Sequence, residues 1–146
     1  SLMCWPAKLE KGSKLELPCS TVDYMPTLLD IAGISYSEGL VLDGESLWPK
    51  LINHGTKRDK PLVFCSGYQG AVIDMDYKLY YTKGKYELYN IAKDPGEKND
   101  ISAAYPEKME RLEKCLKESV EDYRRSFETG KTGDHLDWQD WWNIWK

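Results

Sequence analysis

Apolar residues recur every three or four positions in one long stretch of the second half of the chain, which is the spacing of an amphipathic helix. The stretch begins at Pro106, a residue favoured at the first helical position, and reaches Phe127, shortly before Gly130. On the outer faces, acidic residues precede basic ones by four positions, as Glu107 precedes Arg111. The apolar stripe consists of Tyr105, Met109, Leu112, Leu116, Val120, Tyr123 and Phe127. The pattern predicts one long helix with a single buried face.

Before this helix, short apolar runs separated by turn residues predict an antiparallel sheet. The candidate strands are residues 62–65, 71–73, 77–82 and 86–91. Lys83-Gly84 has the length of a two-residue hairpin connection, in which glycine supplies the positive φ. Asp74 and Asp76 flank another turn, where aspartate is favoured by turn geometry alone, and a two-carboxylate metal or acid-base site is the alternative. Three or four strands with one apolar face need a cover, so we expect the sheet to pack on the long helix.

The first part of the chain has a different pattern. Residues 2–9 form a short apolar segment, stopped by Pro6, that predicts a strand without a partner strand nearby in the sequence. Residues 40–52 indicate a turn that leads into one short helix. A lone strand must pair with a strand elsewhere, so we expect the partner of this segment to lie outside this chain.

Between these two segments, a second helix is predicted from residue 21 to residue 32. Ser20 followed by Asp23 resembles a capping box, and Gly33 suits the end of the helix. Pro26 conflicts with an unbroken helix because its ring displaces the carbonyl four residues earlier. We therefore expect a kink, or a helix that restarts at Pro26.

Composition and charge narrow the class of protein. The chain has 146 residues, of which 41% are hydrophobic and 30% charged, enough apolar material to exclude a wholly disordered chain. The 20 basic and 24 acidic residues give a net charge of −4, which argues against nucleic acid or an anionic membrane as a partner. No apolar run approaches the roughly 20 residues needed to cross a bilayer.

Candidate chemistry is sparse. No spacing typical of a serine hydrolase, a P-loop, a dinucleotide fold or a zinc protease occurs. His54 and His135, the two histidines, both stand in polar contexts typical of solvated residues. The cysteines have no zinc-type spacing, and whether any of them form disulfides stays open at this stage. They are Cys4, Cys19, Cys65 and Cys115. The sequence assigns no catalytic residue and no metal ligand.

The last residues form a tryptophan-rich tail. Four tryptophans follow one another at helical spacing, which predicts a short helix with one wide aromatic stripe. They are Trp138, Trp141, Trp142 and Trp145. We expect the stripe to dock onto the body of the protein, and a sugar-stacking surface is the alternative.

Five short motifs in order give the chain a resemblance to a known family. They are W-P-A-K-L-E-K-G (5–12), T-V-D-Y-M-P-T-L-L-D-I-A-G-I (21–34), L-D-G-E-S-L (42–47), D-Y-K-L (76–79) and E-L-Y-N-I-A-K-D-P-G-E-K-N-D-I (87–101). Their order and spacing resemble the last third of a type I sulfatase of the alkaline-phosphatase-like superfamily. The resemblance covers residues 5–101, and the tail lies outside it.

The resemblance implies an α+β fold with three regions. Residues 1–58 would be the end of the large α/β sulfatase domain, contributing a strand, a kinked helix and a short helix. Residues 59–130 would be the C-terminal subdomain, an antiparallel sheet of three or four strands on one long helix. Residues 131–146 are the tail. The missing N-terminal catalytic domain would be the main partner, and without it the apolar faces in residues 2–52 should be exposed or covered by self-association.

Family catalysis, as the resemblance implies it, uses a formylglycine made from Cys or Ser in a C/S-x-P/A-x-R sequence, beside a calcium ion. We expect these groups in the parent enzyme and not in this chain. Cys4-Trp5-Pro6-Ala7-Lys8 matches that signature except for Lys8, but the residues that follow fit the family's W-P-G-K segment better. The parent would be a sulfuric ester hydrolase acting on a sulfated small molecule or glycan, and the isolated chain is expected to be inactive.

The resemblance also places loops of this region beside the substrate pocket. We expect Tyr68, Gln69 and His54 at its rim. Two other functions stay open at this point: the same part of a phosphoglycerol transferase or phosphodiesterase of the superfamily, and an independent glycan-binding module that uses the tail tryptophans.

Overall fold

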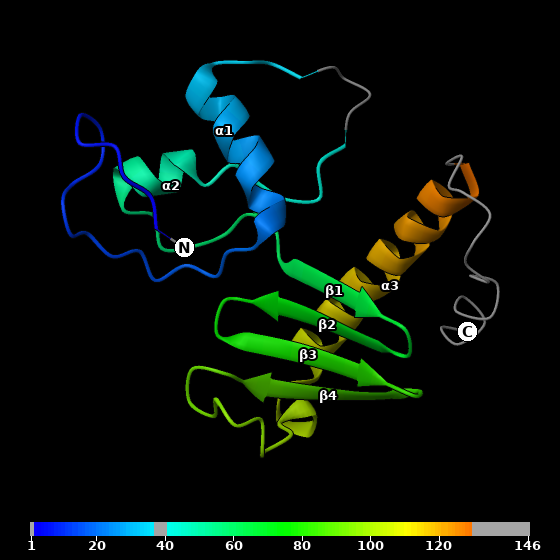
Figure 1. The fold of residues 1–146 in the computed structure, drawn as a ribbon. Coiled ribbons are helices and arrows are strands. Elements are labelled where there is room, and N and C mark those ends of the chain that lie inside the picture. The colour runs from blue at the N-terminus through cyan, green and yellow to red at the C-terminus, as the bar shows by residue number, and fades with distance from the viewer. Residues whose placement is uncertain (1, 37–40, 130–146) are drawn as a thin grey trace. The chain divides into compact units, whose positions relative to one another are not determined.

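The computed structural model describes residues 2–36 and 41–129, with side chains up to residue 126. The chain divides into two compact units, Ser1–Leu62 and Val63–Lys146. Figure 1 shows the helices of the first unit and the sheet and long helix of the second. The tail with its four tryptophans lies outside the described residues.

The second unit contains the predicted four-stranded sheet. Its strands are β1 (Leu62–Ser66), β2 (Gln69–Asp74), β3 (Tyr77–Thr82) and β4 (Lys85–Asn90). They lie in the order β1-β2-β3-β4, and β3 pairs antiparallel with both β2 and β4. Lys83 and Gly84 both have positive φ, 48° and 83°, which suits the right-handed twist of the hairpin they connect. The meander predicted from the sequence is confirmed.

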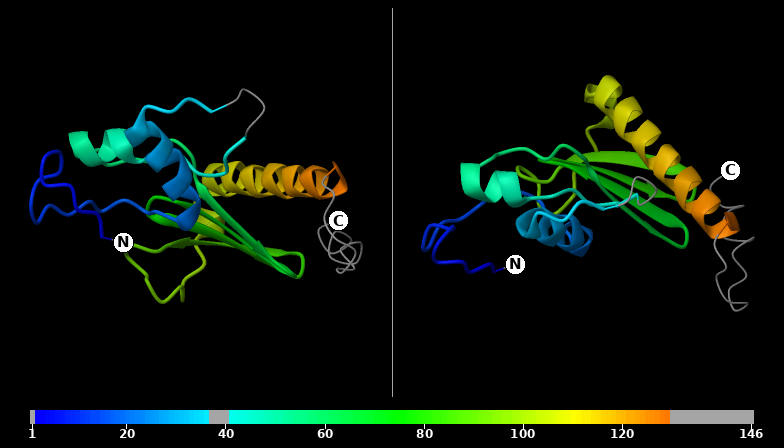
Figure 2. Two further views of the ribbon diagram at one scale, coloured as in Figure 1. Left: turned by 45° about the horizontal axis from the view of Figure 1, so that its top comes forward. Right: turned by 90° about the horizontal axis from the view of Figure 1, so that it is seen from above.

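Helix α3 (Pro106–Thr129) covers one face of this sheet, as the two views in Figure 2 show. The residues of its stripe meet alternate residues of the strands in one apolar core. The core consists of Val72, Leu79, Tyr81, Leu88, Leu112, Leu116 and Val120. Met109 packs against this core and Tyr123 is half-buried, whereas the side chain of Phe127 lies outside the described part. Tyr105, predicted as the first residue of the stripe, precedes the helix and is exposed. The long helix and its buried face are confirmed, and the fold is α+β.

The connection from β4 to α3 folds back along the outer edge of β4. The Leu88 N–H donates to Asp100 Oδ1 at 3.0 Å, and the Leu88 carbonyl accepts from the Ile101 N–H at 2.8 Å. A short 3₁₀ turn, η2 (Ser102–Ala104), then leads to α3. Asp94 holds the preceding loop, because its Oδ2 accepts the Lys98 and Asn99 N–H groups, each at 2.8 Å. The polar residues of the E-L-Y-N-I-A-K-D-P-G-E-K-N-D motif therefore hold this connection in place.

The first unit contains a 3₁₀ turn, η1 (Thr21–Asp23), followed by α1 (Tyr24–Ala32) and a shorter helix, α2 (Trp48–Asn53). Pro26 is buried in the first turn of α1, where a backbone N–H has no helical acceptor, so the helix accommodates it near its start. Gly33 ends the helix with a φ of 64°, as predicted.

The strand predicted for residues 2–9 is not formed. Residues 2–5 have no regular structure, and the N–H groups of Lys8 and Leu9 then donate to the Trp5 carbonyl in a turn. The described residues before β1 include no strand with which this segment could pair, so a β conformation would leave its backbone groups unmet. Instead, the Trp5 ring stacks on Trp48 with 5.4 Å between the ring centroids.

Candidate functional site

Two of the residues predicted at the substrate rim lie together in one turn. Tyr68 and Gln69 follow Gly67, whose φ is 52°, at the tip between β1 and β2, and both are exposed. His54 ends α2 in the first unit with a φ of 51°, and its Nε2 lies 3.9 Å from Glu10 Oε2. The structure places all three side chains at the surface, and the tail tryptophans lie outside the residues it describes.

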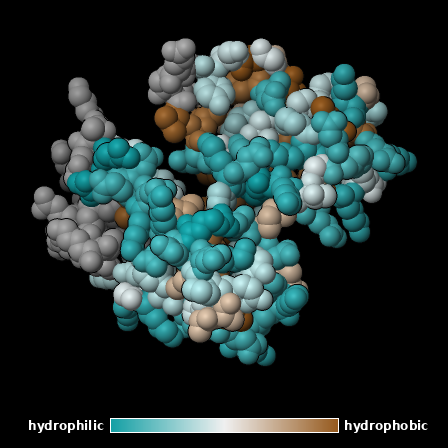
Figure 3. Space-filling model, turned by 180° about the vertical axis from the view of Figure 1, so that it is seen from behind, coloured by the Kyte–Doolittle hydropathy of each residue, from teal (hydrophilic) through white to brown (hydrophobic). Residues whose placement is uncertain are grey.

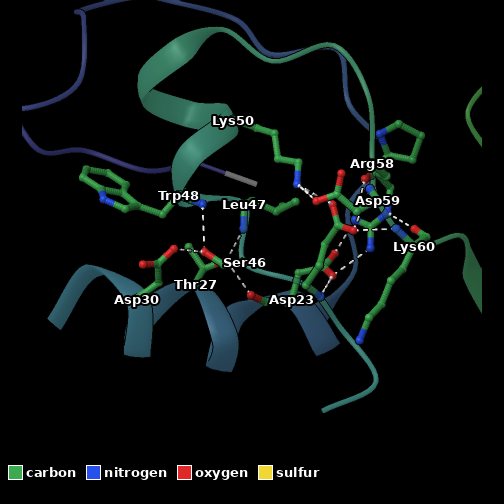
Figure 4. A network of polar contacts seen from close by, with 12 residues as sticks. Asp23, Thr27, Asp30, Ser46, Leu47, Trp48, Lys50, Arg58, Asp59 and Lys60 are labelled. Atoms are coloured by element: carbon green, nitrogen blue, oxygen red, sulfur yellow. Dashed lines mark hydrogen bonds and ion pairs between the residues drawn. The ribbon is translucent and has the colours of Figure 1, made fainter. Parts of the chain in front are cut away.

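The densest polar contacts in the first unit surround Asp23, whose side chain is fully buried (Figure 4). Arg58 approaches this carboxylate with both ends of its guanidinium, from Nη1 to Oδ2 at 2.8 Å and from Nη2 to Oδ1 at 2.9 Å. The N–H groups of Ser20 and Glu45 donate to the same carboxylate at 2.8 and 3.1 Å. Because Arg58 also donates to the carbonyls of Pro18 and Lys60, it joins segments far apart in the sequence.

A second buried carboxylate, that of Glu45, extends this network. Its Oε2 accepts the N–H groups of Asp59 and Lys60 at 2.8 and 2.6 Å. Its Oε1 lies 3.3 Å from the ammonium of Lys50, which also contacts Asp59 at 2.5 Å. Both buried carboxylates are thus neutralised by basic side chains of the same unit.

Hydroxyl groups bind the loop of residues 42–47 to α1. Thr27 Oγ1 donates to the Asp23 carbonyl at 2.6 Å and accepts the Leu47 N–H at 2.9 Å. Ser46 donates to the carboxylate of Asp30. The bonds of Leu47 to Thr27 and of Ser46 to Asp30 join this loop to α1, so the loop follows the helix closely.

Gly44 permits this close approach. A Cβ at residue 44 would lie 2.2 Å from the Val22 carbonyl oxygen and 2.8 Å from the Asp23 nitrogen, distances that no side chain tolerates. The T-V-D-Y-M-P-T and L-D-G-E-S-L motifs therefore meet in space, and Arg58 completes the cluster that they form. We name Asp23, Gly44, Glu45 and Arg58 the polar lock.

The electrostatics of the lock follow from these contacts. Burial alone would raise the pKa of Asp23, but the hydrogen bonds from Arg58 and from two backbone N–H groups outweigh it, so the pKa lies below its usual value. Arg58 is likewise desolvated, yet its pKa is raised by Asp23. Both groups stay charged near neutral pH, and every oxygen of the Asp23 carboxylate is occupied. The lock is built to hold segments together.

No group of three or more His, Cys, Asp or Glu residues in the described ranges could hold a metal ion. Asp74 pairs with Arg111 of α3, while Asp76 is exposed. Cys4, in the segment that resembles the formylglycine signature, is a free and exposed thiol.

The sequence pattern identifies Asp23 only as a helix cap and Glu45 only as a member of the L-D-G-E-S-L motif, and it gives no sign of Arg58. The cap is real, because the Ser20 N–H donates to Asp23, but one carboxylate performs both tasks. Arg58 is 35 residues away, and no local periodicity connects the two. A signal was available in the L-D-G-E-S-L motif, whose glycine indicates a close backbone contact.

Comparison with known proteins identifies the family. The model of the N-sulphoglucosamine sulphohydrolase C-terminal domain matches residues 1–126. The chain belongs to this sulfatase family. The match ends before the tryptophan-rich tail, as the resemblance of residues 5–101 does.

Individual sulfatases and a solved structure are similar over most of the chain. Arylsulfatase K of Danio rerio is 30% identical over 129 residues, which are 79% of this chain and 24% of the relative. Human steryl-sulfatase is 22% identical over 180 residues, covering 99% of this chain and 30% of the relative. A solved structure of a protein in complex with its substrate D-glucosamine-2-N, 6-O-disulfate is 27% identical with a TM-score of 0.52, over 75% of this chain and 25% of that one. The chain thus spans about a quarter to a third of these proteins.

Proposed function

We propose that the chain is the C-terminal part of a sulfuric ester hydrolase and packs against the catalytic part of that enzyme. The relatives support this proposal because they are sulfatases and are three to four times as long as the matched region. Within the described residues, polar side chains of the family motifs form contacts that hold the fold together. The chemistry of sulfate ester cleavage would therefore be carried by other residues of the parent.

The orientation of α1 carries the proposal. The side of the helix that faces the polar lock is polar, because Asp23 and Thr27 are buried there. Some apolar residues lie on the outer side: Val22 in the preceding turn and Met25 and Leu28 in the helix, each three positions from the next, are 43%, 54% and 60% exposed. Leu29 and Ile31 are half-buried. Amphipathic helices ordinarily bury their apolar stripe. Part of the apolar surface of this helix is therefore left outside the unit, as expected if its outer face is covered by another part of the enzyme.

Further exposed apolar residues lie in the same unit, where brown patches are visible in Figure 3. They include Leu2, Met3, Ile34, Tyr36 and Ile52. Exposed apolar patches of this kind mark interaction sites. Full burial of a side chain such as Leu28 contributes about 1.5–3 kcal/mol, so a few of them suffice for stable packing.

The substrate pocket is the second part of the proposal. Tyr68 and Gln69 stand at an exposed hairpin tip, and His54 at an exposed helix end. Such positions allow side chains to reach a pocket formed elsewhere, so we assign these residues to its rim. The substrate would be a sulfated small molecule or a glycan. Calcium and formylglycine would be supplied by the catalytic part, and the formylglycine would attack the sulfur atom there.

Two measurements test this function. The isolated 146-residue chain, incubated with an aryl sulfate and calcium, should show no turnover above background, and turnover would refute the proposal. Leu28→Asp should lower the melting temperature of the full-length enzyme but leave that of the isolated chain unchanged, because Leu28 is 60% exposed there. Equal melting temperatures for the wild-type and variant full-length enzymes would refute the packing role of α1.

A further inference from the structure

The second unit has an apolar surface on the side of the sheet opposite α3. In β1, Val63 and Cys65 pack against the core below α3, so Phe64 between them points to the other face, where it is 45% exposed. In β2, Ala71 and Ile73 flank the buried Val72 in the same way. An antiparallel sheet with one solvated face alternates apolar and polar residues, and β1 and β2 do not.

The neighbouring strand continues this surface. Tyr80 stands between the core residues Leu79 and Tyr81, and its register partner in β2 is Ala71. Aromatic and small residues therefore lie side by side across strands β2 and β3. Phe64 is exposed, and Ala71, Ile73 and Tyr80 are half-buried. We name these four residues the open sheet face.

The charged residues on this side are already paired within the unit. Lys78 contacts both carboxylate oxygens of Glu97 at 2.7 Å, and its ammonium lies 5.6 Å from the centroid of the Tyr80 ring. Lys85 pairs with Glu87 at 2.6 Å. If another surface covered this face, it would bury these two ion pairs intact, and neither pair would contribute an unpaired charge.

We propose that the open sheet face is a second contact surface for the catalytic part of the same enzyme. This inference rests on the proposed function and adds a surface in the other unit of the chain. The chain corresponds to only 24% and 30% of its relatives, so the remaining length of the parent supplies the occupant. The face is apolar and its charges are paired, and it therefore fits an apolar protein surface rather than a polyanion.

Hydroxyl-radical footprinting of the isolated chain and of the full-length enzyme tests this proposal. Phe64 and Tyr80 should be oxidised several-fold more slowly in the full-length enzyme than in the isolated chain. Tyr105 is the matched control, because it is 46% exposed on the α3 side, where it contacts Tyr77 edge-on. Its oxidation rate should be equal in the two proteins.

The same experiment separates this inference from the proposed function. Met25 on the outer face of α1 reports on the proposed function, since it should be protected only in the full-length enzyme. If Met25 is protected but Phe64 and Tyr80 react equally in both proteins, the open sheet face is not an interface and the inference fails alone. If none of the three is protected, both fail. If Phe64 is already protected in the isolated chain, this chain covers its own sheet, which also overturns the inference.

Discussion

Replacing Arg58 with methionine is the sharpest single test of the polar lock. The substitution keeps most of the volume of the side chain but removes the guanidinium. The Asp23 carboxylate would keep only the N–H groups of Ser20 and Glu45 as donors, while the carbonyls of Pro18 and Lys60 would lose theirs. Both partners of the ion pair are essentially inaccessible, with side-chain exposures of 1% for Arg58 and 0% for Asp23.

Breaking a buried ion pair from one side costs about 3–5 kcal/mol, because a charge is left without its partner. We therefore expect the free energy needed to unfold α1 locally to be lower in Arg58→Met by about this amount. If the wild-type value is smaller than this, α1 should exchange like an unfolded segment. The free energy of local unfolding in Arg58→Lys should lie between those of the wild type and Arg58→Met, since lysine keeps the charge but cannot form the bidentate contact.

Hydrogen exchange followed by mass spectrometry measures this locally. Peptides from α1 should lose protection in Arg58→Met, whereas peptides from α3 in the other unit should be unchanged and serve as the internal control. Arg111→Met is the matched variant, because its ion pair with Asp74 is half-exposed and contributes about 0–1 kcal/mol. If α1 exchanges at the same rate in Arg58→Met as in Arg111→Met, the lock does not hold the first unit together.

Two more predictions follow from the contacts. Gly44→Ala should open the lock and abolish the protection of α1 from hydrogen exchange, because the new Cβ would lie 2.2 Å from the Val22 carbonyl oxygen. Gly12→Ala is the control, because its Cβ would have free space and the substitution should cost only the roughly 1–2 kcal/mol of a left-handed backbone. Equal hydrogen exchange in the two variants would contradict the close approach. The hydrogen bonds to Asp23, Asp94 and Asp100 lower the pKa of each carboxyl in the folded protein. They therefore stabilise the fold at pH values above the pKa of an aspartate in the unfolded chain, about 3.9, and this stabilisation is lost as the pH falls through the lower pKa values of the folded protein. Urea unfolding monitored by circular dichroism should therefore show stability decreasing below about pH 4, and stability that is constant down to pH 2 would contradict it.

The second unit was predictable from sequence because its determinants are local. The stripe of α3 and the Lys83-Gly84 turn each specify their own geometry within a few residues, and the structure confirms both. The first unit depends on contacts between distant segments. Its lock joins residues 23 and 58, which periodicity cannot reveal. The strand expected at residues 2–9 needs a partner that the described residues before β1 do not provide. The motifs indicate the family, but the contacts that their residues make are visible only in the folded chain.

The fold-back of the β4–α3 connection has a consequence for how the chain behaves at high concentration. An uncovered outer strand offers a row of free donors and acceptors to the backbone of another molecule, which is a common start of aggregation. At Leu88 both groups are already occupied, the N–H by Asp100 and the carbonyl by Ile101. A second chain cannot add to this side of the sheet by strand pairing at Leu88 without first displacing that connection.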